Sequence, residues 1–359
     1  MARTNRQQHK RTNPATGQVS VVREHAMTYQ PAAPKPKVTV GRPPSPPIDP
    51  EGEVEPAPAR VYLSPSAAST WQQCPRRWWH KYVDKIPEPP PGEPAVIGNF
   101  VHGVLENLTK LDPQERTKDA AKTLAREYFD EFVDTTNWQQ LDYDDAQAKK
   151  FRRRAWAIIE TYFANVDPTK VNPIGQEIQV DVDLDGVPFM GYVDLVERDP
   201  DTGDVVVTDY KTGKPPSTGM PWSGDERGEK LLQPLWYAAA LQEMGEHAPK
   251  HARLIYFTVN ERPDGSFEQV SAELGVDVTD ESIAAARAEL RRRWSQIQDA
   301  KMEGGAPARP GPLCGWCSYV DRCPEGQGEV MQRWETIDKY SGRRKLRDDA
   351  PAVEILGLK

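Results

Sequence analysis

Two aspartates and a lysine near the ends of neighbouring predicted strands are the residues best suited to chemistry in this sequence. Asp194 lies near the end of one apolar segment, and Asp209 and Lys211 end the next. Side chains two residues apart on a β-strand point to the same face, so Asp209 and Lys211 should project together. Carboxylates placed this way can hold Mg²⁺ or Mn²⁺ against a phosphodiester, where the metal makes a nucleophile from water. The Lys211 ammonium would orient that water and offset negative charge in the transition state.

Runs of alternating or continuous apolar residues predict the strands that carry these groups. Asp185-Gly186 is a typical hairpin turn, so the strands on either side of it should pair antiparallel. The second of these strands contains Asp194, and the third ends with Asp209 and Lys211. The predicted strands span residues 177–184, 188–196, 205–211 and 253–258.

Apolar residues at helical spacing predict helices before, between and after the strands. Ser64-Pro65 is a typical helix start, with a capping hydroxyl followed by proline in the first turn. The order is helices, then a mixed sheet with one helix inserted, which indicates the α/β class. The predicted helices span residues 64–82, 98–111, 117–164 with a break near 137–142, 230–244 and 277–301.

Composition divides the chain into three parts. Residues 1–60 are rich in proline and poor in aromatic side chains, which predicts a disordered, basic tail. Residues 61–330 are long enough to bury a sizeable core, and 331–359 are expected to form a polar C-terminal tail. The formal net charge of −8 argues against a purely electrostatic nucleic-acid binder, although a site rich in metal-binding carboxylates can still be acidic.

The cysteines predict a metal or cluster site. No segment resembles a secretory signal or a membrane span, so we expect a cytoplasmic protein with no membrane partner, in which disulfides are rare. Cys314, Cys317 and Cys323 form a C-x₂-C-x₅-C array, and Cys74 is the only other cysteine. Four thiolates suit either Zn²⁺ or a [4Fe–4S] cluster, and the spacing by itself slightly favours zinc.

The two segments around the aspartates resemble those of the PD-(D/E)XK nuclease superfamily. The residues that carry the resemblance are Gly191-Tyr192-Val193-Asp194 and Thr208-Asp209-Tyr210-Lys211-Thr212-Gly213. The chain is most similar to the RecB-like exonuclease branch, which includes the CRISPR-associated exonucleases, over residues 61–330. The resemblance implies a mixed central sheet flanked by helices. It also implies a Mg²⁺- or Mn²⁺-dependent DNA exonuclease acting on single strands or ends, in recombination, repair or phage DNA processing.

The resemblance also implies the metal ligands. They would be Asp194, Asp209, the backbone carbonyl of Tyr210, and His102 in the upstream segment Gly98-Asn99-Phe100-Val101-His102. Glu177, on the preceding strand, approaches the metals in some members of the superfamily.

A Gln-x-x-x-Tyr pair follows the lysine strand. By resemblance, Gln233 and Tyr237 would contact the DNA backbone and the site lysine, and their spacing places both on one helix face. The alternative is an ordinary amphipathic helix with Tyr237 in the core. Pro234 directly follows Gln233, so the helix could begin there rather than at Lys230.

The iron–sulfur members of the branch have one cysteine before the core and three after it. Cys74, Cys314, Cys317 and Cys323 occur in that order. The resemblance therefore implies a structural [4Fe–4S] cluster that joins the two ends of the domain, with Zn²⁺ as the alternative.

Two other functions are alternatives. One is a catalytically silent DNA-binding or assembly subunit, against which every expected catalytic residue type is present. The other is a helicase-nuclease, but Gly213-Lys214 lacks the other residues of a phosphate-binding loop, so a helicase or recombination partner would be a separate chain. Trp71, Trp78 and Trp79 could stack on a strand, although core packing is expected for at least two of them. The arginine run 291–293 could equally be a solvated helix face or a basic contact.

Overall fold

The computed structural model describes residues 9–12, 19–22, 62–216, 226–245 and 247–336. The chain divides into two units, residues 1–59 and 60–359. In the first unit, β1 (His9–Thr12) and β2 (Val19–Val22) pair as an antiparallel hairpin. The rest of the tail expected at 1–60, and residues 337–359 of the expected C-terminal tail, lie outside the described residues.

A mixed five-stranded sheet in the order β3-β4-β5-β6-β7 organises the second unit. Only β5 and β6 pair in parallel, while every other neighbouring pair is antiparallel. Asp185 and Gly186 both have positive φ, of 54° and 84°, as a type I′ hairpin turn between β3 and β4 requires. The strands are β3 (Pro173–Leu184), β4 (Val187–Arg198), β5 (Val205–Lys211), β6 (His251–Glu261) and β7 (Phe267–Asp277). This confirms the predicted α/β class, to which β7 adds an unpredicted strand.

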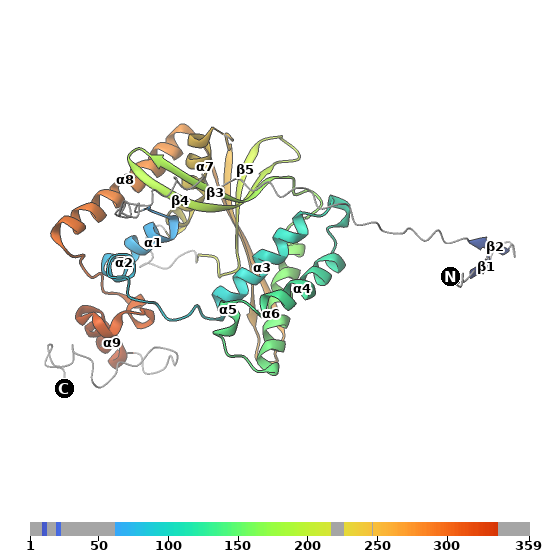
Figure 1. Ribbon diagram of the computed structural model, residues 1–359, viewed down its shortest axis with the longest axis horizontal. Coiled ribbons are helices and arrows are strands. Elements are labelled where there is room, and N and C mark those ends of the chain that lie inside the picture. Colours follow the sequence, from blue (N-terminus) through green and yellow to red (C-terminus); the bar gives the residue numbers. More distant parts are fainter. Residues whose placement is uncertain (1–8, 13–18, 23–61, 217–225, 246, 337–359) are drawn as a thin grey trace, which may run out of the picture. The chain divides into compact units, whose positions relative to one another are not determined.

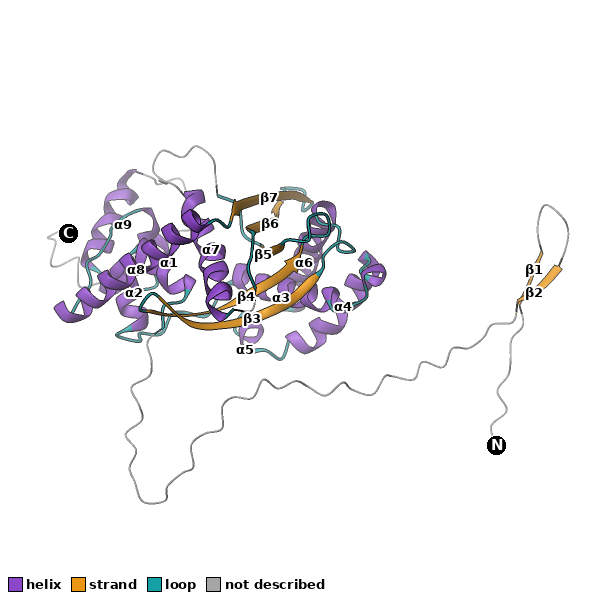
Figure 2. Cartoon of the chain, turned by 90° about the horizontal axis from the view of Figure 1, so that it is seen from above, coloured by secondary structure: helices purple, strands orange, loops and turns teal. Residues whose placement is uncertain are grey.

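Two groups of helices cover the sheet (Figures 1 and 2). One hydrophobic core joins the sheet to α1, α2, α7 and α8, and a second core joins it to α3, α4 and α6. The helices are α1 (Pro65–Gln73), α2 (Pro75–Tyr82), α3 (Glu93–Thr109), η1 (Pro113–Glu115), α4 (Lys118–Phe132), α5 (Thr136–Gln139), α6 (Asp145–Asn165), α7 (Glu226–Met244), α8 (Asp280–Glu303), η2 (Pro312–Trp316), η3 (Val320–Arg322) and α9 (Pro324–Thr336). None of the helices in the described part of the chain has the length and apolarity to cross a bilayer.

Proline explains where the helices depart from the predictions. The segment expected as one helix breaks at Cys74, whose extended φ of −160° and ψ of 110° reflect the exclusion of the helical region before Pro75. Helix α3 begins at Glu93, earlier than predicted, with Pro94 in its first turn. Both predicted starts of α7 are wrong, because Pro234 lies inside a helix that already runs from Glu226.

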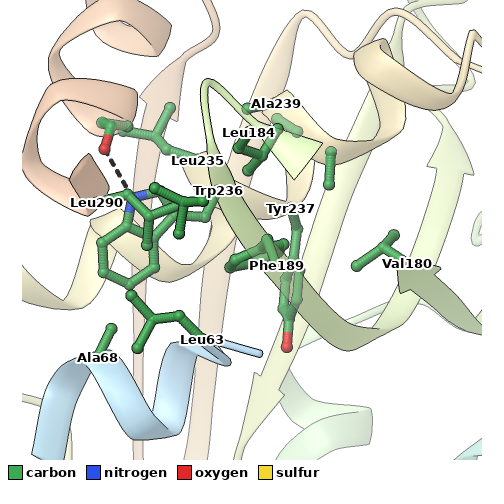
Figure 3. Close-up of a cluster of buried hydrophobic side chains, with 14 of the residues drawn as sticks. Leu63, Ala68, Val180, Leu184, Phe189, Leu235, Trp236, Tyr237, Ala239 and Leu290 are labelled. Atoms are coloured by element: carbon green, nitrogen blue, oxygen red, sulfur yellow. Dashed lines mark hydrogen bonds between the residues drawn. The ribbon is translucent and has the colours of Figure 1, made fainter. Parts of the chain in front are cut away.

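The first core packs around Trp236 and Tyr237 of α7 (Figure 3). Trp236 Nε1 donates a hydrogen bond of 2.8 Å to the backbone carbonyl of Ala286, which ties α7 to α8. The ring of Tyr237 lies edge-on to Phe189 of β4, with 6.3 Å between centroids. Burial of each such aromatic side chain contributes roughly 1.5–3 kcal/mol, so these contacts hold α7 firmly against the strand that carries Asp194.

The same core contains two of the tryptophans considered for base stacking. Trp71 and Trp78 are 3% and 2% exposed, and their rings meet edge-on at 5.4 Å. Stacking on a substrate is therefore excluded for both in this conformation. Trp79 is partly buried and packs against the same core.

Candidate active site

Asp194 and Asp209 lie where β4 and β5 diverge. The ladder between these strands ends at the pair Leu195 and Thr208, so the next two residues to face each other are Asp194 and Asp209. Asp194 Oδ2 accepts a hydrogen bond of 3.1 Å from the backbone N–H of Tyr210. The carboxylate thus accepts from a backbone N–H that has no partner in the ladder. It connects β5 to β4 at their fork, the point beyond Leu195 and Thr208 where the two strands separate.

Glu177 and His102 complete a group of candidate metal ligands with Asp194. One nitrogen or oxygen atom from each of the three residues lies within 4.8 Å of the other two, and His102 Nδ1 is 3.5 Å from Asp194 Oδ2. Glu177 faces Asp194, because the neighbouring residue of β3, Ile178, pairs with Val193. A histidine nitrogen and carboxylate oxygens are ligands that Mn²⁺ accepts, and Mg²⁺ prefers the oxygens.

The backbone of Glu177 has an unusual conformation. Its φ of +48° lies in the left-handed region, although Glu177 is within a strand and is not glycine. Such a conformation costs about 1–3 kcal/mol and is concentrated at functional sites. The expectation that Glu177 approaches the metal group agrees with this placement.

A network of hydrogen bonds and charge surrounds Asp209, which is 1% exposed. Gln233 of α7 donates from Nε2 to Asp209 Oδ1 at 2.9 Å. Lys211 Nζ lies 2.5 Å from Asp209 Oδ2, an ion pair whose angles do not make a directed hydrogen bond. Lys211 also donates to Gln233 Oε1 at 3.2 Å. Gln233 thus contacts both Asp209 and Lys211 of β5.

The pKa values of the candidate ligands show an excess of buried negative charge. Burial, and then the charge of Asp209, raise the pKa of Asp194 well above its usual value. Burial, then Glu106 and Asp209, raise the pKa of Glu177. Burial lowers the pKa of His102 and favours the neutral imidazole that ligates metals, although the charge of Asp209 opposes the shift. Neutral imidazole and crowded carboxylates fit a divalent cation, which would supply the missing positive charge.

Tyr237 lies at the boundary between the core and the site. It is 5% exposed, and burial raises its pKa. Its ring packs so closely on Gly191 of β4 that a Cβ there would lie 2.7 Å from the ring. Gln233 and Tyr237 both line the cleft beside Lys211. Tyr237 therefore packs against β4 and supports it. Contact of Tyr237 with a substrate stays a prediction.

The four cysteines line one cavity of about 230 Å³, to which Cys74 comes from a segment far from the other three in sequence. Backbone N–H groups point at three of the sulfur atoms, at donor-to-sulfur distances of 3.4 Å for Cys74, 3.4 Å for Cys314 and 3.3 Å for Cys323. Such donors stabilise thiolate sulfur. The structure therefore brings together the residues at the two ends of the domain that the sequence grouped.

Other side chains of this cavity test whether a bound group fits. Arg77 Nε and His80 Nε2 are buried without a hydrogen-bond partner in the described chain, and both residues line the cavity. Acceptor sulfur atoms of a bound group would satisfy both. Burial raises the pKa of the Cys317 thiol, and raises that of Cys323 to about 11, so thiolates here depend on a bound cation.

The spacing of the sulfur atoms bears on the size of that group. Among the described residues, no three cysteine sulfurs lie within 4.8 Å of one another. Tetrahedral zinc with bonds of about 2.3 Å would draw four sulfurs to roughly 3.8 Å apart. A single zinc ion would therefore require the four sulfur atoms to move closer together.

The chain is similar to known proteins in sequence and in structure. Residues 62–324 match the PD-(D/E)XK nuclease superfamily. No curated protein matches the chain. A crystal structure described as a "Putative exonuclease", from Eubacterium rectale, is similar over 72% of this chain and 87% of its own, at 13% identity and a TM-score of 0.40.

The family match spans the elements that form the site. It includes α3 with His102, the fork of β4 and β5, and α7 with Gln233. Members of a nuclease superfamily act on nucleic acid. A divalent cation at the candidate ligands, beside the ammonium of Lys211, is suited to hydrolysis of a phosphodiester. Sequence match, mixed sheet and site geometry agree, and the chain belongs to the PD-(D/E)XK nuclease superfamily.

Proposed function

We propose that this protein is a Mg²⁺- or Mn²⁺-dependent DNA exonuclease of the RecB-like branch, acting on single strands or DNA ends. The observation that carries the proposal is the convergence of His102, Glu177 and Asp194 within 4.8 Å, next to the Asp209–Lys211 pair. Recombination, repair or phage DNA processing are the settings that the family resemblance implies. A separate helicase or recombination protein is the partner we propose, because the sequence has no phosphate-binding loop of its own.

Each side chain has a role in this proposal. His102, Glu177, Asp194, Asp209 and the Tyr210 carbonyl would hold the metal, which when bound activates water and offsets charge on the phosphate. Lys211 orients the attacking water and stabilises negative charge that develops on the phosphate oxygens. Gln233 keeps Asp209 and Lys211 in their relative positions through the hydrogen bonds of 2.9 and 3.2 Å.

The test compares wild type with Asp209→Asn and Lys211→Met on end-labelled single-stranded DNA, duplex DNA and RNA, with Mg²⁺, Mn²⁺ or EDTA. We expect metal-dependent release of nucleotides from DNA ends by wild type and a loss of about 10²–10³-fold in each variant. Lys150→Met is the matched control, because Lys150 is 58% exposed and pairs only with Glu261 among described residues. Labelling each end in turn measures polarity.

The outcomes separate the alternatives. A wild type that binds DNA but releases nothing with any metal would support a silent binding or assembly subunit instead. Equal activity in wild type and both variants would indicate a contaminating nuclease and leave the proposed mechanism without support.

We further propose that Cys74, Cys314, Cys317 and Cys323 ligate a structural [4Fe–4S] cluster, with Zn²⁺ as the alternative. The unpartnered donors of Arg77 and His80 and the wide sulfur spacing support a cluster. Protein purified without oxygen should be brown and absorb broadly near roughly 400 nm, as thiolate-ligated iron does. Each Cys→Ser variant should lose that absorbance. A colourless protein with stoichiometric zinc would contradict the cluster.

A further inference from the structure

We propose that Tyr192 is a base-stacking platform that selects single-stranded nucleic acid at this site. The inference rests on the proposed function and narrows its substrate class. Tyr192 is 51% exposed, whereas most large apolar side chains near the site are buried. A single exposed aromatic residue is common on protein surfaces, so the feature that distinguishes Tyr192 is its position.

Tyr192 lies beside the candidate metal ligands. It precedes Asp194 by two residues on β4, so both side chains leave the same face of the strand, about 7 Å apart along it. Its partner across the β3–β4 ladder is Gln179, and Glu177, which lies between the paired residues Gln176 and Ile178, faces Asp194. A nucleotide whose phosphate reaches Asp194 and Glu177 would therefore have a neighbouring base within reach of the Tyr192 ring.

The backbone beneath Tyr192 is fixed. Tyr237 packs on Gly191, the residue directly before Tyr192, without room for a Cβ. Because α7 holds Tyr237 in the core, the strand that presents Tyr192 is held rigidly. A pre-positioned ring loses little conformational freedom when it stacks on a base.

The cleft around Tyr192 has the other features of a single-strand site. It has a volume of about 570 Å³ and is lined by Tyr192 together with Lys211, Lys214 and Lys230. Glu229 also lines it, but two partly buried hydrogen bonds of 2.9 and 2.6 Å from Arg293 hold that carboxylate. Aromatic rings beside cationic side chains bind single strands, because each base presents a face for stacking while the cations follow the phosphates.

The chemistry distinguishes single strands from duplex. In a duplex each base is already stacked on its neighbours, so only base edges and backbone are accessible, whereas an unpaired base can present its face. Trp71 and Trp78 lie in the core, so their rings cannot stack on a base. Tyr192 is therefore the side chain that we assign to stacking.

Binding without turnover tests the inference. Single-stranded DNA that contains 2-aminopurine is titrated in EDTA with wild type, Tyr192→Ala and Tyr192→Phe, and anisotropy and 2-aminopurine fluorescence are recorded. We expect Tyr192→Ala to weaken binding about 10–100-fold and to abolish the fluorescence quenching that stacking produces, while Tyr192→Phe stays within about twofold of wild type. Duplex DNA of the same sequence should bind all three proteins equally.

An oligonucleotide with abasic sites separates stacking from a structural effect. Wild type should bind it as weakly as Tyr192→Ala does, and the variant should lose nothing further. Equal binding of wild type and Tyr192→Ala to the intact strand, or an equal loss on duplex, would overturn the inference. Because no step needs hydrolysis, a wild type that stacks bases but cleaves nothing would contradict only the proposed function.

Discussion

Gln233 donates a hydrogen bond of 2.9 Å to Asp209 and so connects α7 to the buried carboxylate of β5. The other end of the same amide accepts from Lys211 at 3.2 Å. One side chain therefore fixes the separation of an acid and an amine that lie two residues apart. The arrangement depends on Gln233 being both donor and acceptor, which neither a carboxylate nor an apolar side chain can be.

Substitution of Gln233 should therefore lower turnover rather than substrate binding. We expect Gln233→Ala to reduce kcat about 10–100-fold, the usual effect of removing a residue that orients a metal or catalytic group. Gln233→Glu should reduce it further, because a carboxylate repels Asp209. Steady-state kinetics on end-labelled single-stranded DNA provides the measurement. An unchanged kcat with a raised KM would mean that Gln233 binds substrate instead.

Asp194→Asn should stabilise the metal-free protein. The pKa of Asp194 rises from 3.8 on folding because of burial and then Asp209, so between pH 3.8 and the higher folded value the folded state binds more protons than the unfolded state. The free energy of unfolding of wild type thus falls as pH rises through that interval, and the loss is complete above it. Asparagine keeps the acceptor for the Tyr210 N–H without the charge, which should stabilise the fold by about 0.5–2 kcal/mol at pH 8.

Denaturation in EDTA at pH 4 and pH 8 measures this effect. The difference between variant and wild type should be larger at pH 8. Added Mn²⁺ should raise the Tm of wild type, because an ion that binds only the folded state stabilises that state. It should have little effect on the Tm of Asp194→Asn, which lacks one ligand. A variant less stable than wild type at pH 8 would contradict the electrostatic account.

Glycine at position 177 should be tolerated better than alanine. The φ of +48° at position 177 destabilises the fold for any residue with a Cβ, whereas glycine adopts this angle without strain. We expect Glu177→Gly to be more stable than Glu177→Ala by about 1 kcal/mol, with metal affinity reduced equally in both. Gln179, two residues along β3 without positive φ, is the matched control, where alanine should be the more stable. The same order at both positions would exclude backbone strain at Glu177.

Gly191→Ala should destabilise the domain through overpacking. A Cβ at this position would lie 2.7 Å from the Tyr237 ring, so α7 or β4 must move, at a cost of about 1–3 kcal/mol. Gly305→Ala is the control, because nothing lies within 4 Å of its Cβ position. Urea denaturation gives both values. A neutral Gly191→Ala would show that the ring has room to withdraw.

Arg293→Met should cost far more stability than Arg291→Met. The Arg293 side chain is 1% exposed and pairs with Glu229 and Glu289, at 2.6 and 2.7 Å. Removal of one member of a buried pair costs about 3–5 kcal/mol. Arg291 is 47% exposed and pairs with Asp185, so its loss should cost at most about 1 kcal/mol. Equal effects in thermal unfolding would contradict the buried network.

These contacts also show how the arginine run 291–293 is placed. Arg292 pairs with Glu289, so all three arginines have acidic partners within the chain. Arg293 is buried, whereas Arg291 and Arg292 are solvent-exposed but paired with carboxylates, so the run is not an open basic surface. A sequence shows neighbouring charges along the chain, whereas the acidic partners come from other turns and elements.

Local sequence pattern determined the parts of the fold that depend on neighbouring residues. Strand β5 spans 205–211 as predicted, and the Asp185-Gly186 turn has the positive φ angles expected of it. Asp209 and Lys211 meet because a strand repeats every two residues, which needs no knowledge of tertiary structure. Strand β7 escaped prediction because it is an edge strand with mostly exposed side chains, whose weak apolar pattern only pairing with β6 makes regular.

Tertiary structure alone decided which distant residues meet. The group of His102, Glu177 and Asp194 comes from one helix and two strands, and its atoms lie within 4.8 Å only because α3 and the sheet share a core. Packing likewise buried Trp71 and Trp78 and left Tyr192 at the cleft, although all three are aromatic. Periodicity reports the conformation of a segment, whereas exposure and distance between segments are set by how apolar faces combine to exclude water.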